Sequence, residues 1–144
     1  MRALLDVNVL IALFDEDHIH SDRAHEWFSA NSDKGWASCP LTENGVVRIM
    51  SQPGFSAKLR HSPSQMIARL ADFAAKTDHE FWPDAISLRD PAKFDTTRIL
   101  GARQITDLYL LALAAHHNGR LITFDETIIL SAVPAASSSN LVVI

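Results

Sequence analysis

Met1-Arg-Ala-Leu-Leu-Asp6-Val-Asn8-Val-Leu-Ile-Ala-Leu-Phe14-Asp15 is the stretch of sequence that decides which fold we predict for this chain. Residues 3–5 form an apolar run without a polar face, which is typical of a strand buried on both sides in a parallel sheet. Residues 7–14 are apolar at nearly every position except Asn8, and this longer, leucine-rich run favours a buried helix. The pattern predicts a central strand that ends at Asp6 and passes at once into a helix.

The carboxylate of Asp6 has two interpretations. Aspartate is a favourable N-cap, because its side chain accepts hydrogen bonds from the first free N–H groups of a helix. In open α/β sheets, however, ligands bind at the carboxyl ends of the strands. A charge buried there costs free energy unless a partner compensates it. The functional interpretation therefore requires partners for Asp6 elsewhere in the chain.

Length and composition indicate a globular protein. The 144 residues are 47% hydrophobic and 21% charged, which predicts one domain spanning residues 1–144. The single cysteine, Cys39, excludes an intrachain disulfide and a cysteine-based metal site. No apolar run approaches the ~20 residues of a membrane span, and residues 1–15 lack the pattern of a signal peptide. We therefore expect a soluble, cytoplasmic protein that has no membrane partner.

The net charge limits how this chain could bind a nucleic acid. Its formal value is −4 at pH 7, with a pI near 5.9. A protein that holds nucleic acid through a broad basic surface has the opposite balance. A polyanionic substrate would have to be attracted by metal ions and by a few local Arg or Lys side chains.

Strand-like and helix-like segments alternate along the chain. Helices are predicted for residues 7–14, from Ser21 or Asp22, from Pro40, from Ser62 and for residues 107–117 with Thr106 as the N-cap. Strands are predicted for residues 3–5, 36–39, 80–82, 120–124 and 141–144. This alternation predicts an α/β fold with three layers (α/β/α) and a parallel sheet. Residues 84–104 carry mixed signals, with a short helix expected within residues 94–100.

A second acidic side chain is expected on the buried side of the third helix. Glu43 is spaced at helical intervals from the apolar residues Val46, Val47 and Met50. The alternative is that Glu43 only complements the helix dipole. A capping box that uses Glu43 would need Ser or Thr three residues earlier, where Pro40 stands instead.

Two further acids are expected at the same edge of the sheet. Asp107 opens the helix of residues 107–117, where a negative charge also suits the helix dipole, and Asp125 ends a strand as Asp6 does. Right-handed crossovers place the carboxyl ends of parallel strands on one edge. We therefore predict that Asp6, Glu43, Asp107 and Asp125 converge, with no Lys or Arg adjacent in sequence to neutralise them.

Converging carboxylates favour metal-dependent chemistry. Two carboxylates ~4 Å apart repel by several kcal/mol at an effective dielectric constant of about 20. Hard divalent cations relieve this repulsion, and an all-oxygen site selects Mg²⁺ or Mn²⁺ over zinc. Such ions activate water and neutralise charge on a phosphoryl oxygen. The acidic quartet thus predicts metal-dependent phosphodiester hydrolysis.

Three histidines form a weaker candidate for a metal site. His18, His20 and His25 lie in or just after the polar turn that follows the first helix. They are accompanied by neither cysteine ligands nor an HExxH pattern. We therefore favour a surface or helix-entry packing role for them over zinc binding.

Four segments surround the predicted acids: Asp6-Val-Asn8-Val-Leu, Thr42-Glu43-Asn-Gly-Val-Val-Arg48, Thr106-Asp107-Leu-Tyr-Leu-Leu-Ala-Leu-Ala and Leu121-Ile-Thr123-Phe-Asp125. They resemble the four motifs of PIN domains, in particular those of the ribonuclease toxins of VapBC toxin–antitoxin systems of the mycobacterial-type subgroup. Their order and spacing fit the family from residue 2 to about residue 126. Residues 84–104 match no motif, and substrate choice is expected to lie in such loops.

The resemblance implies a five-stranded parallel sheet with strand order 3-2-1-4-5 and a Mg²⁺- or Mn²⁺-dependent endoribonuclease that cleaves RNA. It also implies a homodimer inhibited by a cognate antitoxin, which often inserts a basic side chain into the acidic site. Carried over by position, the acidic quartet is Asp6, Glu43, Asp107 and Asp125, with Asn8 and Thr123 as supporting polar groups. The roles of these positions in the family favour Asp6 and Asp107 as direct metal ligands.

An apolar pattern also bears on assembly. Residues 108–115 are apolar on every side, and residues 7–14 are nearly so. One sheet face cannot hide both completely in a domain of this size. We therefore expect part of this surface to meet a second copy in an isologous dimer.

Two other functions remain open at this point. Haloacid-dehalogenase-type phosphotransferases also place a nucleophilic Asp after the first strand, but they need a second Asp two residues later, where this chain has Asn8. A catalytically inactive PIN-fold binding module is the non-enzymatic alternative. Loss of activity usually removes one of the acids, and here all four are present.

Overall fold

Five parallel strands form the centre of the protein, in a computed structural model that describes residues 1–144. They are β1 (Ala3–Leu5), β2 (Trp36–Ser38), β3 (His79–Phe81), β4 (Arg120–Thr123) and β5 (Leu141–Val143). Their order across the sheet is β3-β2-β1-β4-β5, and every neighbouring pair is parallel. The predicted strand order is confirmed.

Strand β1 lies in the middle of the sheet because both of its faces are apolar. Ala3 and Leu5 point into one hydrophobic core, whereas Leu4 points into a second core on the opposite face. All three side chains are at most 1% exposed. Alternate residues of a strand face opposite sides of a sheet, so a run with no polar position can only be accommodated between two layers.

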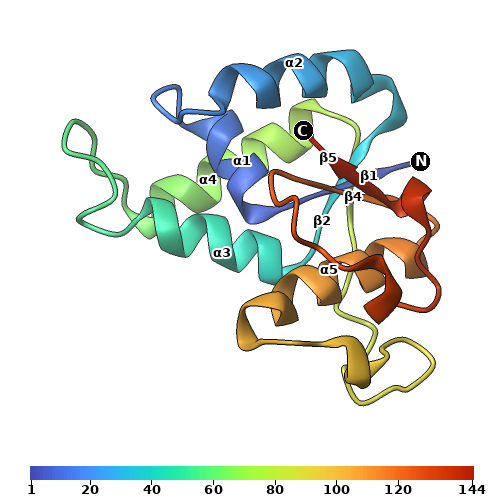
Figure 1. Ribbon diagram of the computed structural model, residues 1–144. Helices are drawn as coiled ribbons and strands as arrows, with labels where there is room; N and C mark the ends of the chain where they lie inside the picture. The colour runs from blue at the N-terminus through green and yellow to red at the C-terminus, as the bar shows by residue number, and fades with distance from the viewer.

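Helices cover both faces of the sheet. They are α1 (Val7–Phe14), α2 (Ser21–Asn31), α3 (Pro40–Met50), α4 (Pro63–Lys76) and α5 (Ile105–His116). Buried residues of α1 to α4 belong to the core on one face, and those of α5 belong to the core on the other. Figure 1 shows α2 and α5 on opposite sides of the strands. The three-layer α/β/α architecture is confirmed.

The start of α5 differs from the prediction. A 3₁₀ turn, Ala102–Gln104, leads directly into the helix, so α5 begins at Ile105 and Gln104 occupies the N-cap position. Thr106 is therefore an exposed residue of the first turn, and its expected role as N-cap is wrong. The 3₁₀ turn provides the entry into the helix that a capping side chain would otherwise supply.

Residues 84–104 cover the outer side of α5. The short helix expected within residues 94–100 is reduced to one 3₁₀ turn, Thr96–Arg98. Phe94 is buried, Ile86 and Ile99 pack against the same core, and the Tyr109 hydroxyl donates a hydrogen bond to the Ile86 carbonyl at 3.0 Å. In Figure 1 this yellow segment passes beneath α5.

This cover changes the inference about assembly. Residues Leu108 to Ala114 of α5 are all buried within the single chain. Helix α1 is likewise buried from Val9 to Phe14. The apolar character of these helices is therefore explained within one protomer, and it supplies no argument for a dimer. None of the helices combines the length and apolar character needed to cross a membrane.

Candidate functional site

The carboxyl edge of β1 places Asp6 at the start of α1. Asp6 has an extended backbone (φ −61°, ψ 154°), and its Oδ1 accepts a hydrogen bond from the Val7 N–H at 2.7 Å. The side chain thus has the capping role that its position predicts. Asp6 is only 7% exposed, and no cationic group lies within ion-pair distance of it.

Strand β4 supplies the hydrogen-bond donor for the second carboxylate oxygen of Asp6. The hydroxyl of Thr123, which is fully buried, donates to Asp6 Oδ2 at 2.8 Å. The same hydroxyl accepts a hydrogen bond from the Asp125 N–H at 3.1 Å. Asp125 Oδ1 in turn accepts from the N–H and the hydroxyl of Thr127 at 2.7 and 2.6 Å. This chain of contacts holds Asp6 and Asp125 in a fixed relation across two adjacent strands.

Asp107 reaches the same place from the first turn of α5. Burial raises its pKa to about 7, and the negative charge of Asp6 and an interaction with Asp125 act in the same direction. Burial also raises the pKa of Asp6, against the opposing effect of its hydrogen bonds from Thr123 and Val7. The hydrogen bonds from Thr127 lower the pKa of Asp125. Three carboxyl groups from β1, α5 and the end of β4 are thus close enough to influence one another's protonation.

Glu43 is oriented differently. It lies in the first turn of α3, where a reciprocal pair formed by Cys39 and Thr42 caps the helix, so its carboxylate is not used for capping. Glu43 Oε1 instead accepts a hydrogen bond from the Ser38 hydroxyl at 2.7 Å. Ser38 Oγ also lies 2.8 Å from Nε2 of His79. The structure therefore brings Asp6, Asp107 and Asp125 together and directs Glu43 towards β2 and β3.

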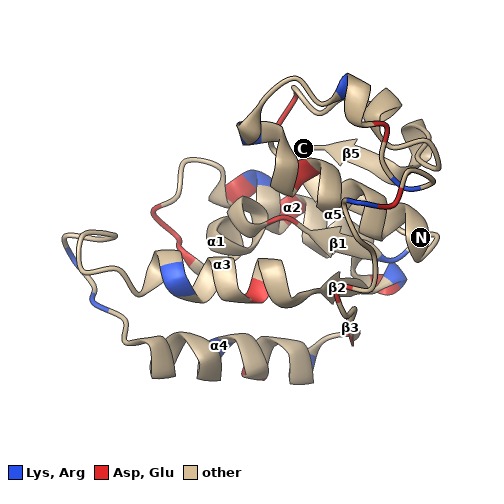
Figure 2. Cartoon of the chain, turned by 90° about the horizontal axis from the view of Figure 1, so that it is seen from below, with Lys and Arg blue, Asp and Glu red and all other residues tan.

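Helix α3 nevertheless passes close to the acidic centre. Gly45 faces Val7 of α1, and a Cβ atom at this glycine would lie 2.7 Å from Val7 Cγ2. The absence of a side chain at Gly45 therefore allows α3 and α1 to approach closely. Figure 2 shows α3 running beside α1, with acidic and basic positions along its length. This approach puts the second predicted motif next to the first.

Two hollows open on either side of Asp107. One, of about 360 Å³, is lined by ten residues that include Asp6, Asn8, Arg48 and Asp107. The other, of about 260 Å³, is lined by seven residues that include Arg103, Asp107, Asp125 and Thr127. We call them the Arg48 hollow and the Arg103 hollow. Asn8 is exposed and lines the first of them.

The donor atoms of this centre fit a hard divalent cation. They are carboxylate oxygens, which Mg²⁺ and Mn²⁺ prefer. Burial is the main cause of the raised pKa of Asp107, and the neighbouring Asp6 and Asp125 add a repulsion that a cation would relieve. No group of three or more His, Cys, Asp or Glu side chains is gathered closely enough to form a ready-made metal cage. Loading the centre therefore requires side-chain adjustment, and Glu43, whose Oε1 accepts a hydrogen bond from Ser38, would take part through its other carboxylate oxygen.

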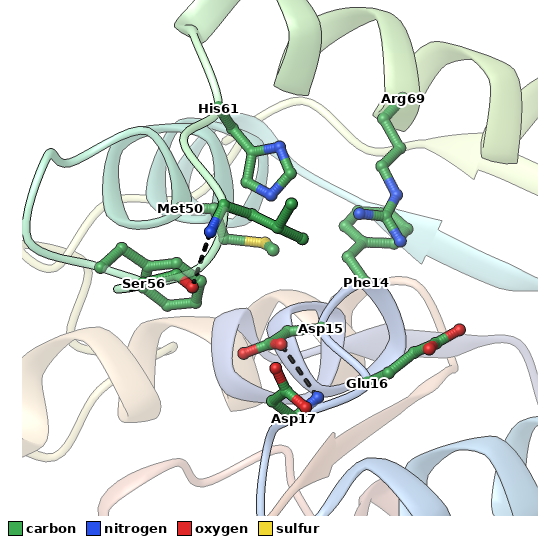
Figure 3. A pocket seen from close by; sticks show the side chains of 10 residues that line it. Phe14, Asp15, Glu16, Asp17, Met50, Ser56, His61 and Arg69 are labelled. Carbon is green, nitrogen blue, oxygen red and sulfur yellow. Dashed lines mark hydrogen bonds between the residues drawn. The ribbon is translucent and has the colours of Figure 1, made fainter.

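A different hollow lies beyond the C-terminal end of α1. It measures about 280 Å³ and is lined by Asp15, Glu16 and Asp17 on one side and by residues including His61 and Arg69 on the other (Figure 3). The Asp17 N–H donates to Asp15 Oδ1 at 3.0 Å, so these acids belong to a local turn. None of the acidic quartet lines this hollow.

The three histidines do not form a metal site. His18 and His20 pack near the ring of Phe124, with centroid distances of 6.1 and 4.7 Å, while His25 is exposed on α2. The guanidinium of Arg23 lies over the same Phe124 ring, 5.4 Å from its centroid. Packing at the entry to α2 accounts for His18 and His20.

Sequence reasoning did not single out the neighbours that matter most to the acids. Ser38 holds Glu43, and Arg48 and Arg103 line the two hollows. Arg48 falls within the second quoted motif, so its position five residues after Glu43 was visible in the sequence. Ser38 lies five residues before Glu43 and Arg103 lies four residues before Asp107, so both were also near the acids in sequence, but no helix or strand pattern predicted that their side chains would lie beside these carboxylates.

The chain also resembles known proteins along most of its length. Residues 3–134 match the PIN domain family. Ribonuclease VapC44 of Mycobacterium tuberculosis is 46% identical over 141 residues, which cover 98% of each chain. Ribonuclease VapC39 of the same organism is 43% identical over 128 residues, covering 89% of this chain and 91% of that protein. VapBC2 from Rickettsia felis, solved bound to a DNA fragment from its promoter, has a similar fold, with a TM-score of 0.56, 16% identity and coverage of 94% of this chain and 95% of that one.

Proposed function

Because this chain belongs to the PIN-domain family and, within it, to the VapC ribonucleases, we propose that it is an endoribonuclease and the toxin component of a type II toxin–antitoxin system. The observation that supports this activity most directly is the convergence of Asp6, Asp107 and Asp125 from three separate segments on two adjoining hollows, with no basic side chain paired to them. Three carboxyl groups held together without a cation are poorly suited to structural stability. They are well suited to binding a divalent metal beside a phosphodiester.

The proposed metal ligands are Asp6, Asp107 and Asp125, with Glu43 as a further ligand through the carboxylate oxygen that Ser38 does not engage. A bound Mg²⁺ or Mn²⁺ would lower the pKa of a water molecule and neutralise charge on the phosphoryl group. Thr123 fixes Asp6 by donating to Oδ2, so one carboxylate is oriented before any ligand arrives. Asp107, whose pKa is about 7, would release its proton when a cation replaces that proton as its partner.

The proposed activity is tested by cleavage of RNA. The purified chain is incubated with total bacterial RNA in Mg²⁺, in Mn²⁺ and in EDTA, and the products are separated on a denaturing gel. We expect fragments in Mg²⁺ or Mn²⁺ and none in EDTA. Activation by zinc alone would contradict the all-oxygen site, and the absence of cleavage in every metal would favour an inactive PIN-fold binding module.

We propose two protein partners, a cognate antitoxin and a second copy of the chain. The antitoxin proposal is supported by the similarity to VapC proteins, and an acidic centre without a cation is complementary to a basic side chain from such a partner. It is tested by adding the product of a neighbouring small reading frame to the cleavage assay, where inhibition is expected. The homodimer is supported by the family resemblance alone, and sedimentation at micromolar concentration should show a dimer; a monomer would contradict it.

A further inference from the structure

Two arginines lie on opposite sides of the acidic centre. Arg48, in the last turn of α3, lines the Arg48 hollow together with Asp6 and Asp107. Arg103, in the 3₁₀ turn before α5, lines the Arg103 hollow together with Asp107 and Asp125. Because Asp107 lines both hollows, they adjoin at the acidic centre. Each hollow is lined by a different arginine.

Neither arginine is used by the fold. The ion pairs of the chain involve Arg2, Arg98 and three lysines, and no carboxylate lies within 4.0 Å of either Arg48 or Arg103. Neither side chain appears among the hydrogen-bond donors, and both are exposed. The position of Arg48 suits the C-terminal end of a helix dipole, but that role does not require it to line a hollow with Asp6. Arg103 has no such helix end to complement.

The ligand that fits these positions is an anion lying across the carboxylates. A guanidinium carries a permanent charge and five N–H donors in a planar fork, which matches the oxygens of a phosphate. The whole chain has a net charge of −4, so attraction for a polyanion must come from local cations. With one phosphate of a polynucleotide over the acidic centre, the two hollows that adjoin it are the places open to the neighbouring phosphates.

We infer that Arg48 and Arg103 bind phosphates of the RNA strand on the two sides of the bond that is cleaved. This inference rests on the proposed ribonuclease function and adds the position of the strand: it crosses Asp107 and extends from one hollow into the other. The two arginines are substrate-binding residues, and neither contributes an acid or a base to the reaction.

The test is the salt dependence of RNA binding. The probe is a fluorescein-labelled, single-stranded RNA of 20 nucleotides, and binding is measured by anisotropy in EDTA between 50 and 200 mM salt. All proteins carry Asp107→Asn, which prevents cleavage and removes one repelling charge. Arg48→Gln, Arg103→Gln and the double variant are compared with Arg89→Gln, because Arg89 is exposed and unpaired but lines neither hollow.

We expect each of the two arginine substitutions to reduce the slope of log K against log salt by about 0.7, the value for one phosphate contact on a single strand. The double variant should lose about twice as much slope, and affinity should fall by roughly a factor of ten or more at the lowest salt. Arg89→Gln should change neither quantity. An unchanged slope in the double variant, or no measurable RNA binding by the Asp107→Asn protein itself, would overturn the inference.

A parallel cleavage assay, in which the parent chain and the double arginine variant keep Asp107, separates this inference from the proposed function. If the chain binds RNA with the expected slope changes but does not cleave it in Mg²⁺ or Mn²⁺, the ribonuclease function fails and the arginine site stands. If the parent chain cleaves RNA and the double arginine variant binds and cleaves as well as the parent, only the arginine site fails. Thermal melts of the variants should match that of the parent, since both side chains are exposed and unpaired.

Discussion

The two ends of the parallel strands, which we call the amino edge and the carboxyl edge of the sheet, differ in how their charged side chains are paired. At the amino edge, the Arg2 guanidinium donates to Asp78 Oδ1 and to Glu80 Oε2 at 2.9 Å each, and to the Trp36 carbonyl at 3.1 Å. At the carboxyl edge, three carboxyl groups lie together with no cation within ion-pair distance. The acids at the amino edge are thus paired with an arginine, whereas the acids at the carboxyl edge have no cationic side chain as a partner.

This contrast indicates which edge serves stability and which serves binding. The amino edge joins three segments, residue 2, the start of β2 and β3, through opposite charges and backbone acceptors, and needs nothing from solution. The carboxyl edge keeps like charges together while Arg48 and Arg103 remain nearby but unpaired. An arrangement that costs stability persists where a ligand uses it.

The largest expected difference between the edges is in activity. Asp107→Asn should reduce RNA cleavage at least about a hundredfold, because even residues that only orient a metal ligand cost 10- to 100-fold when changed. Asp78→Asn, the matched change at the amino edge, should leave cleavage unchanged. Both are measured as rates of RNA cleavage in Mn²⁺ after circular dichroism has shown that each variant is folded. Normal cleavage by Asp107→Asn would end the acidic-centre hypothesis.

Glu43 tests how far the carboxyl edge extends. Because its carboxylate is held by Ser38, Glu43→Gln should reduce cleavage less than Asp107→Asn does, by roughly tenfold. The measurement is the same rate of RNA cleavage, together with the thermal response to Mn²⁺. A loss as large as that of Asp107→Asn would mean that Glu43 joins the other three acids once the metal is bound.

A divalent metal should raise the melting temperature of the protein by binding at the carboxyl edge only. A ligand that binds only the folded state, present at about 100 times its Kd, adds about 2.7 kcal/mol, or roughly 5–10 °C in Tm for a chain of this size. We expect this rise with Mn²⁺ for the parent and for Asp78→Asn, and a much smaller rise for Asp107→Asn. Differential scanning fluorimetry measures it. A parent melting temperature that does not respond to millimolar Mn²⁺ would count against the metal site.

Substituting an arginine should lower the free energy of unfolding at the amino edge but hardly change it at the carboxyl edge. Arg2→Gln leaves two carboxylates and a carbonyl without their partner, and should lower the free energy of unfolding by about 1–2 kcal/mol, since the carboxylates are half exposed and screened by solvent. Arg103→Gln should change it by less than about 0.5 kcal/mol. Urea denaturation of both variants compares them. Equal losses would show that Arg103 is also structural.

The smallest effect is the pH dependence of stability in metal-free buffer. Asp107 has a folded-state pKa of about 7, above the 3.8 of an ordinary aspartate, so its stabilising contribution is complete below pH 3.8 and is lost as pH rises towards 7. The parent should therefore lose stability relative to Asp107→Asn over this range, by on the order of 1 kcal/mol after allowance for solvent screening. Denaturation of both proteins at pH 5 and pH 7.5 in EDTA measures the difference. A difference that stays constant with pH would contradict the raised pKa.

Much of the fold was determined by patterns that act over short distances. The apolar run before Asp6 required a strand with two covered faces, and the alternation of segments with right-handed crossovers brought the strand ends to one edge. The placement of Asp6, Asp107 and Asp125 at that edge follows from these local patterns, since each is adjacent to the end of a strand or the start of a helix. Whether a segment forms a helix or a strand, and at which edge of the sheet its ends lie, depend on residues that are close together in the sequence.

Contacts between distant segments were decided only by the tertiary structure. The burial of α5 depends on residues 84–104, whose sequence shows no periodicity, so the helix looked exposed when considered alone. The Arg48 hollow depends on where α3 lies beside α1 and the start of α5. The orientation of Glu43 is decided by a nearer contact, its hydrogen bond from Ser38 five residues earlier, which the helical pattern of α3 does not predict. Side-chain direction and the pairing of charges arise from packing, because a few ångströms decide whether a hydrogen bond or an ion pair forms, and no pattern of residue types along the chain specifies distances of that size.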